Sequence, residues 1–163
     1  MTNRGASIGK AAMNEAIAGL RAYMENLRET ENTTNLAEGL RAKATDPRFT
    51  ALMQVDLNLE IENDDNMSAD RTNRVLAIVG EALANAARHA QAHHVLVIAR
   101  RQKNRLMLAI EDDGHGFKPG APNAAGYGLR DMHDHARLLG GELTVESKPG
   151  EGTRIRLLAP WGE

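Results

Sequence analysis

Five short segments rich in apolar residues predict β-strands, and they are the feature that most constrains the fold. Residues 55–62 alternate apolar and polar side chains, and successive side chains of a strand point to opposite faces of a sheet, so this strand is expected to have one solvated face. The five segments are residues 55–62, 95–101, 105–112, 142–147 and 152–160. Helices are predicted for residues 69–91 and 126–139. The order strand, helix, two strands, helix, two strands favours one sheet that carries helices on one face.

An amphipathic helix is predicted near the start of the sequence, where apolar residues recur at heptad-like spacing. The stripe consists of Met13, Ile17, Leu20, Met24 and Leu27. Such a narrow stripe needs a partner. Either a second chain covers it, in a homodimer through residues 8–28, or it folds back on Leu36 and Leu40 of the next helical piece.

Two parts are predicted along the chain, a helical segment of residues 1–49 and a globular domain of residues 50–163. Polar residues 30–35 break the first helix. Asp46 is expected to cap a last helical turn that Pro47 opens, because a carboxylate accepts from free helix N–H groups and proline fits the first helical position.

Composition excludes several classes of protein. A chain of 163 residues without cysteine has neither a disulfide scaffold nor a thiolate metal site. A net charge of −2 and a pI near 6.3 give no polycation for nucleic acid. No apolar run approaches the roughly 18 residues that span a bilayer, so we expect a cytoplasmic location and no membrane contact by these residues.

The stretch EDDGHGF, residues 111–117, ends a predicted strand with carboxylates and glycines. One interpretation is a metal site, but Asp112 and Asp113 are adjacent on a strand and should point to opposite faces. A second is a tight turn without chemistry, since Asp-Gly pairs favour turns. A third is a pocket in which Asp112 accepts from a ligand donor, such as the exocyclic amine of a purine, while Gly114 and Gly116 allow close approach.

The longest predicted helix contains EALANAARHA, residues 81–90. At about 100° per residue, an apolar face opposes a polar face that consists of Glu81, Asn85, Arg88 and His89. The polar face is either solvated or able to hold a hydrated Mg²⁺ and an anionic phosphate together. Mg²⁺ prefers oxygen ligands and keeps several waters, so one asparagine oxygen can suffice.

Residues 117–125 have no periodicity and precede a helix that opens with GYGL. Their two prolines and small residues suit a loop that closes over a ligand. Gly126, Gly128 and the following helix start offer free N–H groups, which favour an anion. The six histidines form no pattern typical of zinc, and no nucleophile elbow appears.

Together these segments resemble the catalytic, ATP-binding domain of sensor histidine kinases, in the gyrase, Hsp90, histidine kinase and MutL superfamily. EALANAARHA resembles the family's N box, EDDGHGF its DxGxG box, GYGL its second glycine box and PGEGTRIRL its closing strand pair. The resemblance implies a Bergerat-type ATP-binding fold: an α/β (α+β) two-layer sandwich with a mixed, mostly antiparallel sheet, helices on one face and a helical segment in front. The match is most similar to the nitrate-sensor-type subgroup that pairs with LuxR-type response regulators.

The resemblance implies a protein histidine kinase that binds Mg-ATP. Asp112 would bind the adenine amine, with Thr153 supporting it through water. Asn85 would ligate Mg²⁺, and Glu81 would orient or activate the attacking group. The remaining implied ATP-binding residues are Arg88, His89, Gly114, Gly116, Gly126, Gly128 and Leu129.

No histidine occurs before residue 89, so the implied phosphoacceptor helix must lie outside this sequence. The γ-phosphoryl group would pass to a histidine on that dimerisation helix and then to a response regulator, with no nucleic-acid partner. Two alternatives remain open at this stage. One is an anti-sigma-factor serine kinase of the same superfamily, and the other is a catalytically silent nucleotide-binding or partner-binding module.

Overall fold

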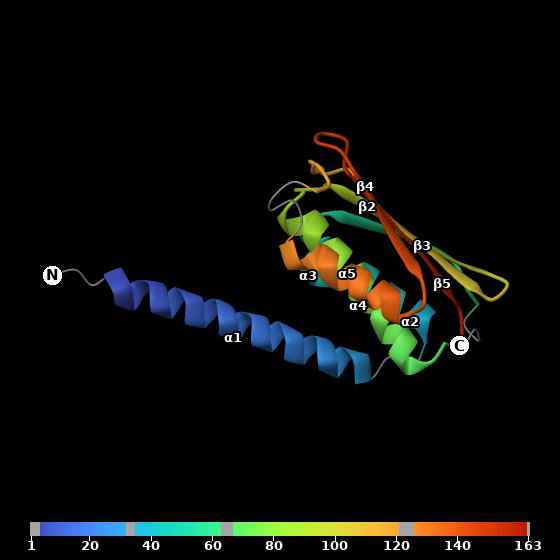
Figure 1. Ribbon diagram of the computed structural model, residues 1–163, viewed down its shortest axis with the longest axis horizontal. Helices are drawn as coiled ribbons and strands as arrows, with labels where there is room; N and C mark the ends of the chain where they lie inside the picture. Colours follow the sequence, from blue (N-terminus) through green and yellow to red (C-terminus); the bar gives the residue numbers. More distant parts are fainter. Residues whose placement is uncertain (1–3, 32–34, 63–66, 121–125, 163) are drawn as a thin grey trace. The chain divides into compact units, whose positions relative to one another are not determined.

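A computed structural model describes residues 4–31, 35–62, 67–120 and 126–162 (Figure 1). The chain divides into two compact units, residues 1–33 and 34–163. None of the described helices combines the length and apolar character needed to cross a membrane.

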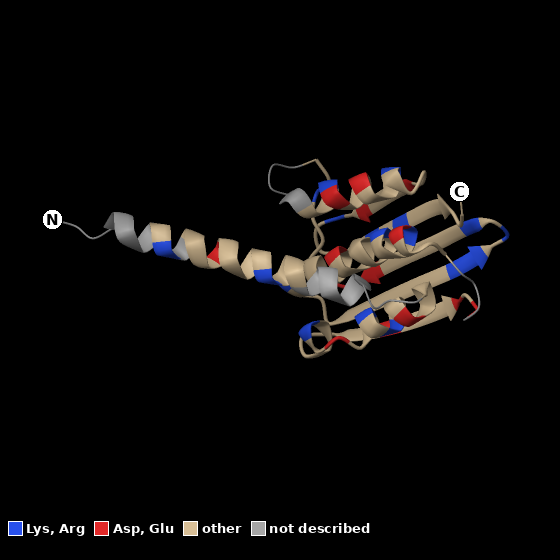
Figure 2. Ribbon diagram, turned by 90° about the horizontal axis from the view of Figure 1, so that it is seen from below, with Lys and Arg blue, Asp and Glu red and all other residues tan. Residues whose placement is uncertain are grey.

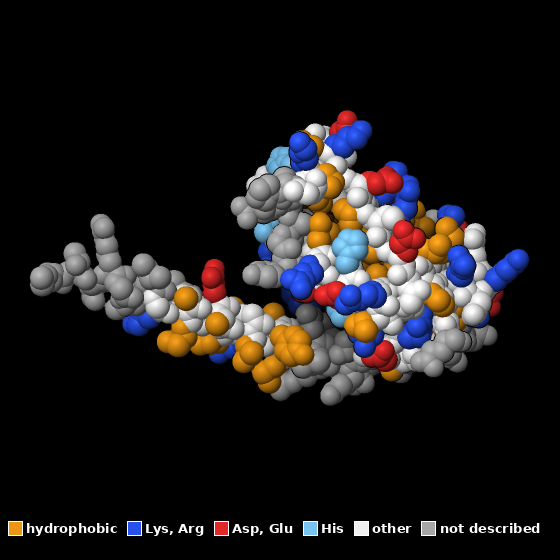
Figure 3. Space-filling model, viewed as in Figure 1, with side chains coloured by type: hydrophobic (Ala, Val, Ile, Leu, Met, Phe, Trp, Pro, Cys, Tyr) orange, Lys and Arg blue, Asp and Glu red, His pale blue; other side chains and the backbone are white. Residues whose placement is uncertain are grey.

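The described residues of the first unit form one helix, α1 (Arg4–Glu31). The predicted helix is therefore present and extends a few residues beyond each predicted end. Its described apolar side chains gather along one side (Figure 3) and are exposed: Met13, Ile17, Leu20, Tyr23 and Met24. A homodimer through residues 8–28 stays a proposal.

The second unit is a five-stranded sheet with helices packed on one face (Figure 1). The strands are β1 (Gln54–Glu60), β2 (His94–Gln102), β3 (Arg105–Asp112), β4 (Glu142–Ser147) and β5 (Thr153–Pro160), in the order β1-β2-β3-β5-β4. The helices are α2 (Leu36–Ala44), α3 (Pro47–Thr50), α4 (Ala69–Arg88) and α5 (Gly126–Leu138). Only the β1–β2 pair is parallel among these strands. The predicted two-layer, mostly antiparallel architecture is confirmed.

Strand register decides which side chains meet the helices. The alternate residues Ile110 of β3 and Ile155 of β5 are cross-strand partners and are buried against the helices. Two residues further along, Asp112 pairs with Thr153, and Ser147 of β4 also pairs with Thr153. Because side chains alternate along strands, these three polar residues share the helix-covered face at one end of the sheet.

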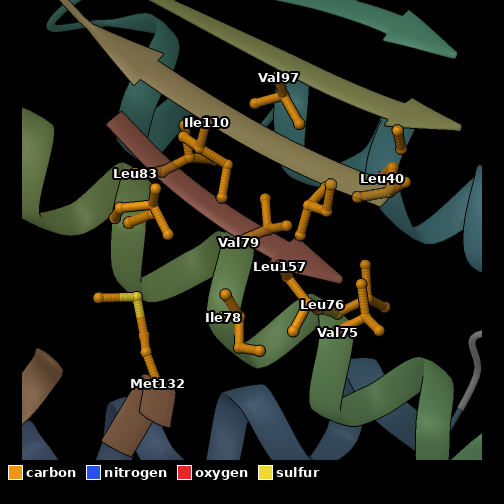
Figure 4. Close-up of a cluster of buried hydrophobic side chains, with 14 of the residues drawn as sticks. Leu40, Val75, Leu76, Ile78, Val79, Leu83, Val97, Ile110, Met132 and Leu157 are labelled. Atoms are coloured by element: carbon orange, nitrogen blue, oxygen red, sulfur yellow. The ribbon is translucent and has the colours of Figure 1, made fainter. Parts of the chain in front are cut away.

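The core lies between the sheet and α4 (Figure 4). Figure 4 shows Val75, Val79 and Leu83 of α4 in one cluster with Val97, Ile110 and Leu157 of the sheet. These side chains are at most 3% exposed. The apolar face predicted for this helix is therefore the buried face.

The compact unit begins earlier than the boundary predicted at residue 50. Leu36 and Leu40 of α2 are fully buried in the same core, and α2 packs on α4 and β1. The predicted boundary was based on the change from helical to strand-like periodicity near residue 50. That change could not show that α2 belongs to the second unit, because α2 joins it through tertiary packing. The interpretation of residues 1–49 as the remnant of a dimerisation or phosphoacceptor unit, which the family resemblance implies, remains a proposal.

Capping follows the sequence prediction. The Asp46 carboxylate accepts from the backbone N–H of Arg48, and Pro47 is the first residue of α3. The long helix α4 ends at Arg88, before the predicted residue 91. Both His89 and Ala90 donate to the Asn85 carbonyl, and Gln91 has a left-handed φ of 48°, which a continuing helix does not permit.

Candidate functional site

Asp112 lies half-buried at the end of β3, facing the helices. Its Oδ1 accepts from the backbone N–H of Gly114 at 2.9 Å. Burial raises the pKa of Asp112 above its usual value of 3.8, while hydrogen bonds from the backbone N–H groups of Gly114 and Thr153 oppose that rise. A carboxylate has about four acceptor positions, so acceptor capacity remains for a ligand donor.

Asp113 has a different, structural role. Its Oδ1 accepts from the backbone N–H groups of His93 at 2.8 Å and His94 at 2.9 Å, at the start of β2. These bonds lower the pKa of Asp113, with His94 the larger cause. The prediction that the adjacent aspartates point apart is confirmed. No group of three or more potential His, Asp or Glu metal ligands occurs among the described residues.

The glycines of EDDGHGF are required by close backbone contacts. A Cβ on Gly114 would overlap Ala90, two residues after the end of α4, whose carbonyl accepts from the His115 N–H at 2.8 Å. Gly116 has a φ of 63°, and a Cβ there would overlap the Lys148 carbonyl. The turn is thus held against both α4 and the β4–β5 turn, which places Asp112 beside the end of α4.

Glu81 and Asn85 lie one turn apart on α4, and both are partly exposed. A Cβ on Gly128 of α5 would come within 2.9 Å of the Glu81 Cδ, so the second glycine segment packs directly on Glu81. Leu129 packs against the core beside them. The structure therefore brings together the predicted residues of two distant segments.

Arg88 and His89 are exposed at the end of α4, as a solvated face requires. Gly126 begins α5, which confirms the predicted helix start. Most of the predicted closing loop, residues 121–125, lies outside the described residues. The roles of Arg88, His89, Gly126 and the loop therefore remain predictions.

Ser147 is the site residue that sequence analysis missed. It is 7% exposed, and its Oγ bonds to Thr153 and to the backbone of Phe117 and Gly152. The available signal was its position: it ends the alternating segment ELTVES on the same face as Val145. A serine at a strand end has no distinctive pattern without knowledge of its neighbours.

A separate hollow lies at the other end of the sheet, by the β2–β3 turn. In Figure 2 the ribbon of this turn is blue, the colour of Lys and Arg residues. The hollow is lined by Gln102, Lys103, Asn104, Arg105, Met107, Leu158 and Pro160. It contains none of the predicted site residues.

Residues 70–163 match the sequence profile of the histidine kinase-, DNA gyrase B-, and HSP90-like ATPase family. The chain belongs to this family. A curated relative, the sensor histidine kinase LiaS of Bacillus subtilis, is 34% identical over 147 residues, which are 90% of this chain and 40% of LiaS. DegS of Brevibacillus brevis, a signal transduction histidine-protein kinase/phosphatase, is 36% identical over 51% of this chain and 22% of DegS. The chain thus spans less than half the length of these relatives.

Solved structures agree with this membership. The ATP-binding domain of PrrB from Mycobacterium tuberculosis superposes with a TM-score of 0.63 and 26% identity, over 79% of this chain and 96% of that domain. Full-length ShkA, solved in complex with AMPPNP, shares the fold with a TM-score of 0.62 and 18% identity, over 99% of this chain and 40% of ShkA. The strand order and helix layer described above are therefore those of a histidine kinase ATPase domain.

Proposed function

We propose that this chain binds Mg-ATP and supplies the γ-phosphoryl group to a histidine on a dimerisation helix that this sequence does not contain. The observation that carries the proposal is the Asp112 carboxylate, half-buried beside α4 with acceptor positions left over. A purine amine can donate a hydrogen bond to this carboxylate. Because Asp112 is half-buried, a bound ligand that lacks such a donor would leave the carboxylate unpaired and would bind less tightly.

The residues of α4 fit a magnesium ion that is shared with phosphates. Asn85 would offer one amide oxygen and Glu81 a carboxylate one turn away, while waters and the nucleotide would complete the ligand shell. Bound there, Mg²⁺ would neutralise charge that develops on the transferring phosphoryl group.

The protein's own groups would act mainly by position and charge. Asp112 would hold the base at one end of the site, and Glu81 would orient the attacking imidazole at the other. Arg88 and His89, exposed at the end of α4, would approach the phosphates from the polar face of the same helix. The Gly126–Leu129 helix start would offer backbone N–H groups to the phosphates.

The likeness to LiaS over 90% of the chain supports a two-component sensor kinase more than an anti-sigma-factor kinase. On this proposal the partners are ATP, a dimerisation and phosphoacceptor helix, and a response regulator. Pairing with a LuxR-type regulator, as in the nitrate-sensor-type subgroup, belongs to the same proposal.

Calorimetric titration with a non-hydrolysable ATP analogue, with and without Mg²⁺, tests it. Asp112→Asn should weaken binding about 10-fold to 100-fold, the range expected for a hydrogen bond to a charged group. Asp113→Asn is the matched control and should bind like the parent, because Asp113 holds the β2 start instead. Asn85→Ala should remove the Mg²⁺ dependence. A folded parent chain that binds no nucleotide would overturn the proposed function.

A further inference from the structure

The Ser147 hydroxyl joins three separate segments of the site. The backbone N–H of Phe117, which follows the glycine turn, donates to Ser147 Oγ at 2.8 Å. Ser147 Oγ lies 3.1 Å from the Gly152 carbonyl and 2.8 Å from Thr153 Oγ1. Thr153 is the cross-strand partner of Asp112, a Cβ on Gly152 would overlap the Asp112 carbonyl, and Phe117 follows the glycine turn that begins after Asp112.

Counting protons fixes the direction of these bonds. A hydroxyl has one proton and two lone pairs. The Gly152 carbonyl can only accept, so Ser147 must use its proton there. The Phe117 N–H can only donate, so it occupies one lone pair of Ser147. The Thr153 hydroxyl must then donate its own proton to the second lone pair.

Because the Thr153 hydroxyl proton is used in the bond to Ser147, the Thr153 oxygen can only accept a hydrogen bond from any other neighbour. Its side chain shares the helix-covered face with Asp112, its direct cross-strand partner. Two neighbouring groups on this face therefore offer only acceptors when Asp112 is ionised. Water or a ligand in contact with them has to supply the protons.

We propose that Ser147 is a positioning residue that sets the base specificity of the site, by holding Thr153 as an acceptor beside the Asp112 carboxylate. The inference rests on the proposed function and deepens it. The site then accepts a 6-amino purine, whose exocyclic group donates, and rejects a 6-oxo purine, whose oxygen meets two acceptors. Unpaired buried acceptors make this rejection effective.

Removing the Ser147 hydroxyl frees the Thr153 proton to rotate toward the base. In Ser147→Ala, Thr153 can donate to a 6-oxo group directly or through water. We expect the ratio of ATP to ITP affinity to fall about threefold to tenfold, the worth of one neutral hydrogen bond. Ser147→Thr keeps the hydroxyl and should restore the ratio of the parent.

The test is calorimetric titration of the full chain with ATP and with ITP, for the parent, both Ser147 variants and Thr153→Val. A fall in the ratio for Ser147→Ala, with restoration by Ser147→Thr, supports the inference. Equal weakening of both nucleotides would mean that Ser147 acts only as a structural tie and would overturn it. Circular dichroism of each variant reports folding independently.

Thr153→Val keeps the test decisive if Ser147→Ala fails to fold, because it removes the oriented hydroxyl itself. It should also change the ATP to ITP ratio, and an unchanged ratio would overturn the inference. A parent chain that binds ATP while these ratios stay constant would leave the proposed function standing. A folded parent that binds neither nucleotide would instead remove the proposed function.

Discussion

The Glu81 carboxylate of α4 occupies the space that a side chain at position 128 of α5 would need. This relationship joins two segments that lie 47 positions apart in the sequence. The position of the Glu81 side chain therefore depends on how closely α5 packs against α4. A change at Gly128 therefore acts on Glu81 without removing any functional group.

Gly128→Ala should gain less stability than Gly80→Ala, because its methyl group must first displace the Glu81 carboxylate, the flexible end of that side chain. Gly80→Ala is the matched control on α4. A Cβ there meets only the flexible Lys43 side chain at 3.5 Å, and alanine favours helix over glycine by about 1 kcal/mol. Urea unfolding of both variants measures the difference. A Gly128→Ala protein as stable as Gly80→Ala would contradict the close contact.

Asp112→Asn should leave the protein at least as stable as the parent at neutral pH. Burial raises the pKa of Asp112 in the folded state. The folded protein then holds a proton that the unfolded chain has lost, so its stability falls as pH rises from 3.8 through the raised value. The asparagine variant escapes this cost.

The difference in unfolding free energy between Asp112→Asn and the parent should therefore shrink on acidification. Chemical denaturation at neutral pH and at a pH below 3.8 measures it. Asp113→Asn should show the opposite trend, because hydrogen bonds lower the pKa of Asp113 in the folded protein. The parent gains stability from Asp113 at neutral pH and loses it as the carboxylate protonates. Parallel pH profiles for the two variants would refute this assignment.

Gly116→Ala should cost more stability than Gly150→Ala. Both glycines have left-handed backbone, with φ values of 63° and 82°. Alanine in that conformation costs about 1–2 kcal/mol at either position. Only at Gly116 would the new methyl group also overlap backbone, the Lys148 carbonyl, whereas Gly150 faces open space. Thermal unfolding of the two variants isolates this second cost, and equal losses would exclude it.

Arg71→Met should lower the free energy of unfolding by about 1–3 kcal/mol, the cost of leaving buried polar groups unpaired. The buried Arg71 side chain donates to the Leu139 carbonyl at 3.0 Å and to the Pro160 carbonyl. It thus fastens the start of α4 to the end of α5 and to β5. Arg71→Lys keeps a donor and should recover part of the loss in urea unfolding. A fully stable methionine variant would mean that water satisfies both carbonyls.

Local patterns in the sequence were sufficient for features that a single segment decides. Alternation along β3 correctly placed Asp112 and Asp113 on opposite faces, and residue type correctly identified Asp46 as a helix cap. These outcomes depend on neighbours within a few positions. Short-range geometry is the same wherever the segment lies in the fold.

Features that depend on distant segments could not be predicted in this way. The three hydrogen bonds of Ser147 form only when β4, β5 and the glycine turn come together in the fold. The sequence around Ser147 therefore contains no pattern that predicts them. The burial of Leu36 and Leu40 depends on α4 and β1, which lie later in the chain. The early end of α4 depends on a left-handed residue, Gln91, whose type does not demand that conformation.

The order β1-β2-β3-β5-β4 also affects how the domain forms during synthesis. The strand that separates β3 from β4 is translated after both of them. Until β5 emerges, β3 and β4 each expose an edge that later pairing will cover, and exposed edges invite aggregation. Thr153 is the first residue of β5, the last strand of the sheet to be translated. The pair of hydrogen-bond acceptors, Asp112 and Thr153, is therefore complete only after β5 has formed. A nascent chain stalled before that point would have Asp112 without its neighbour.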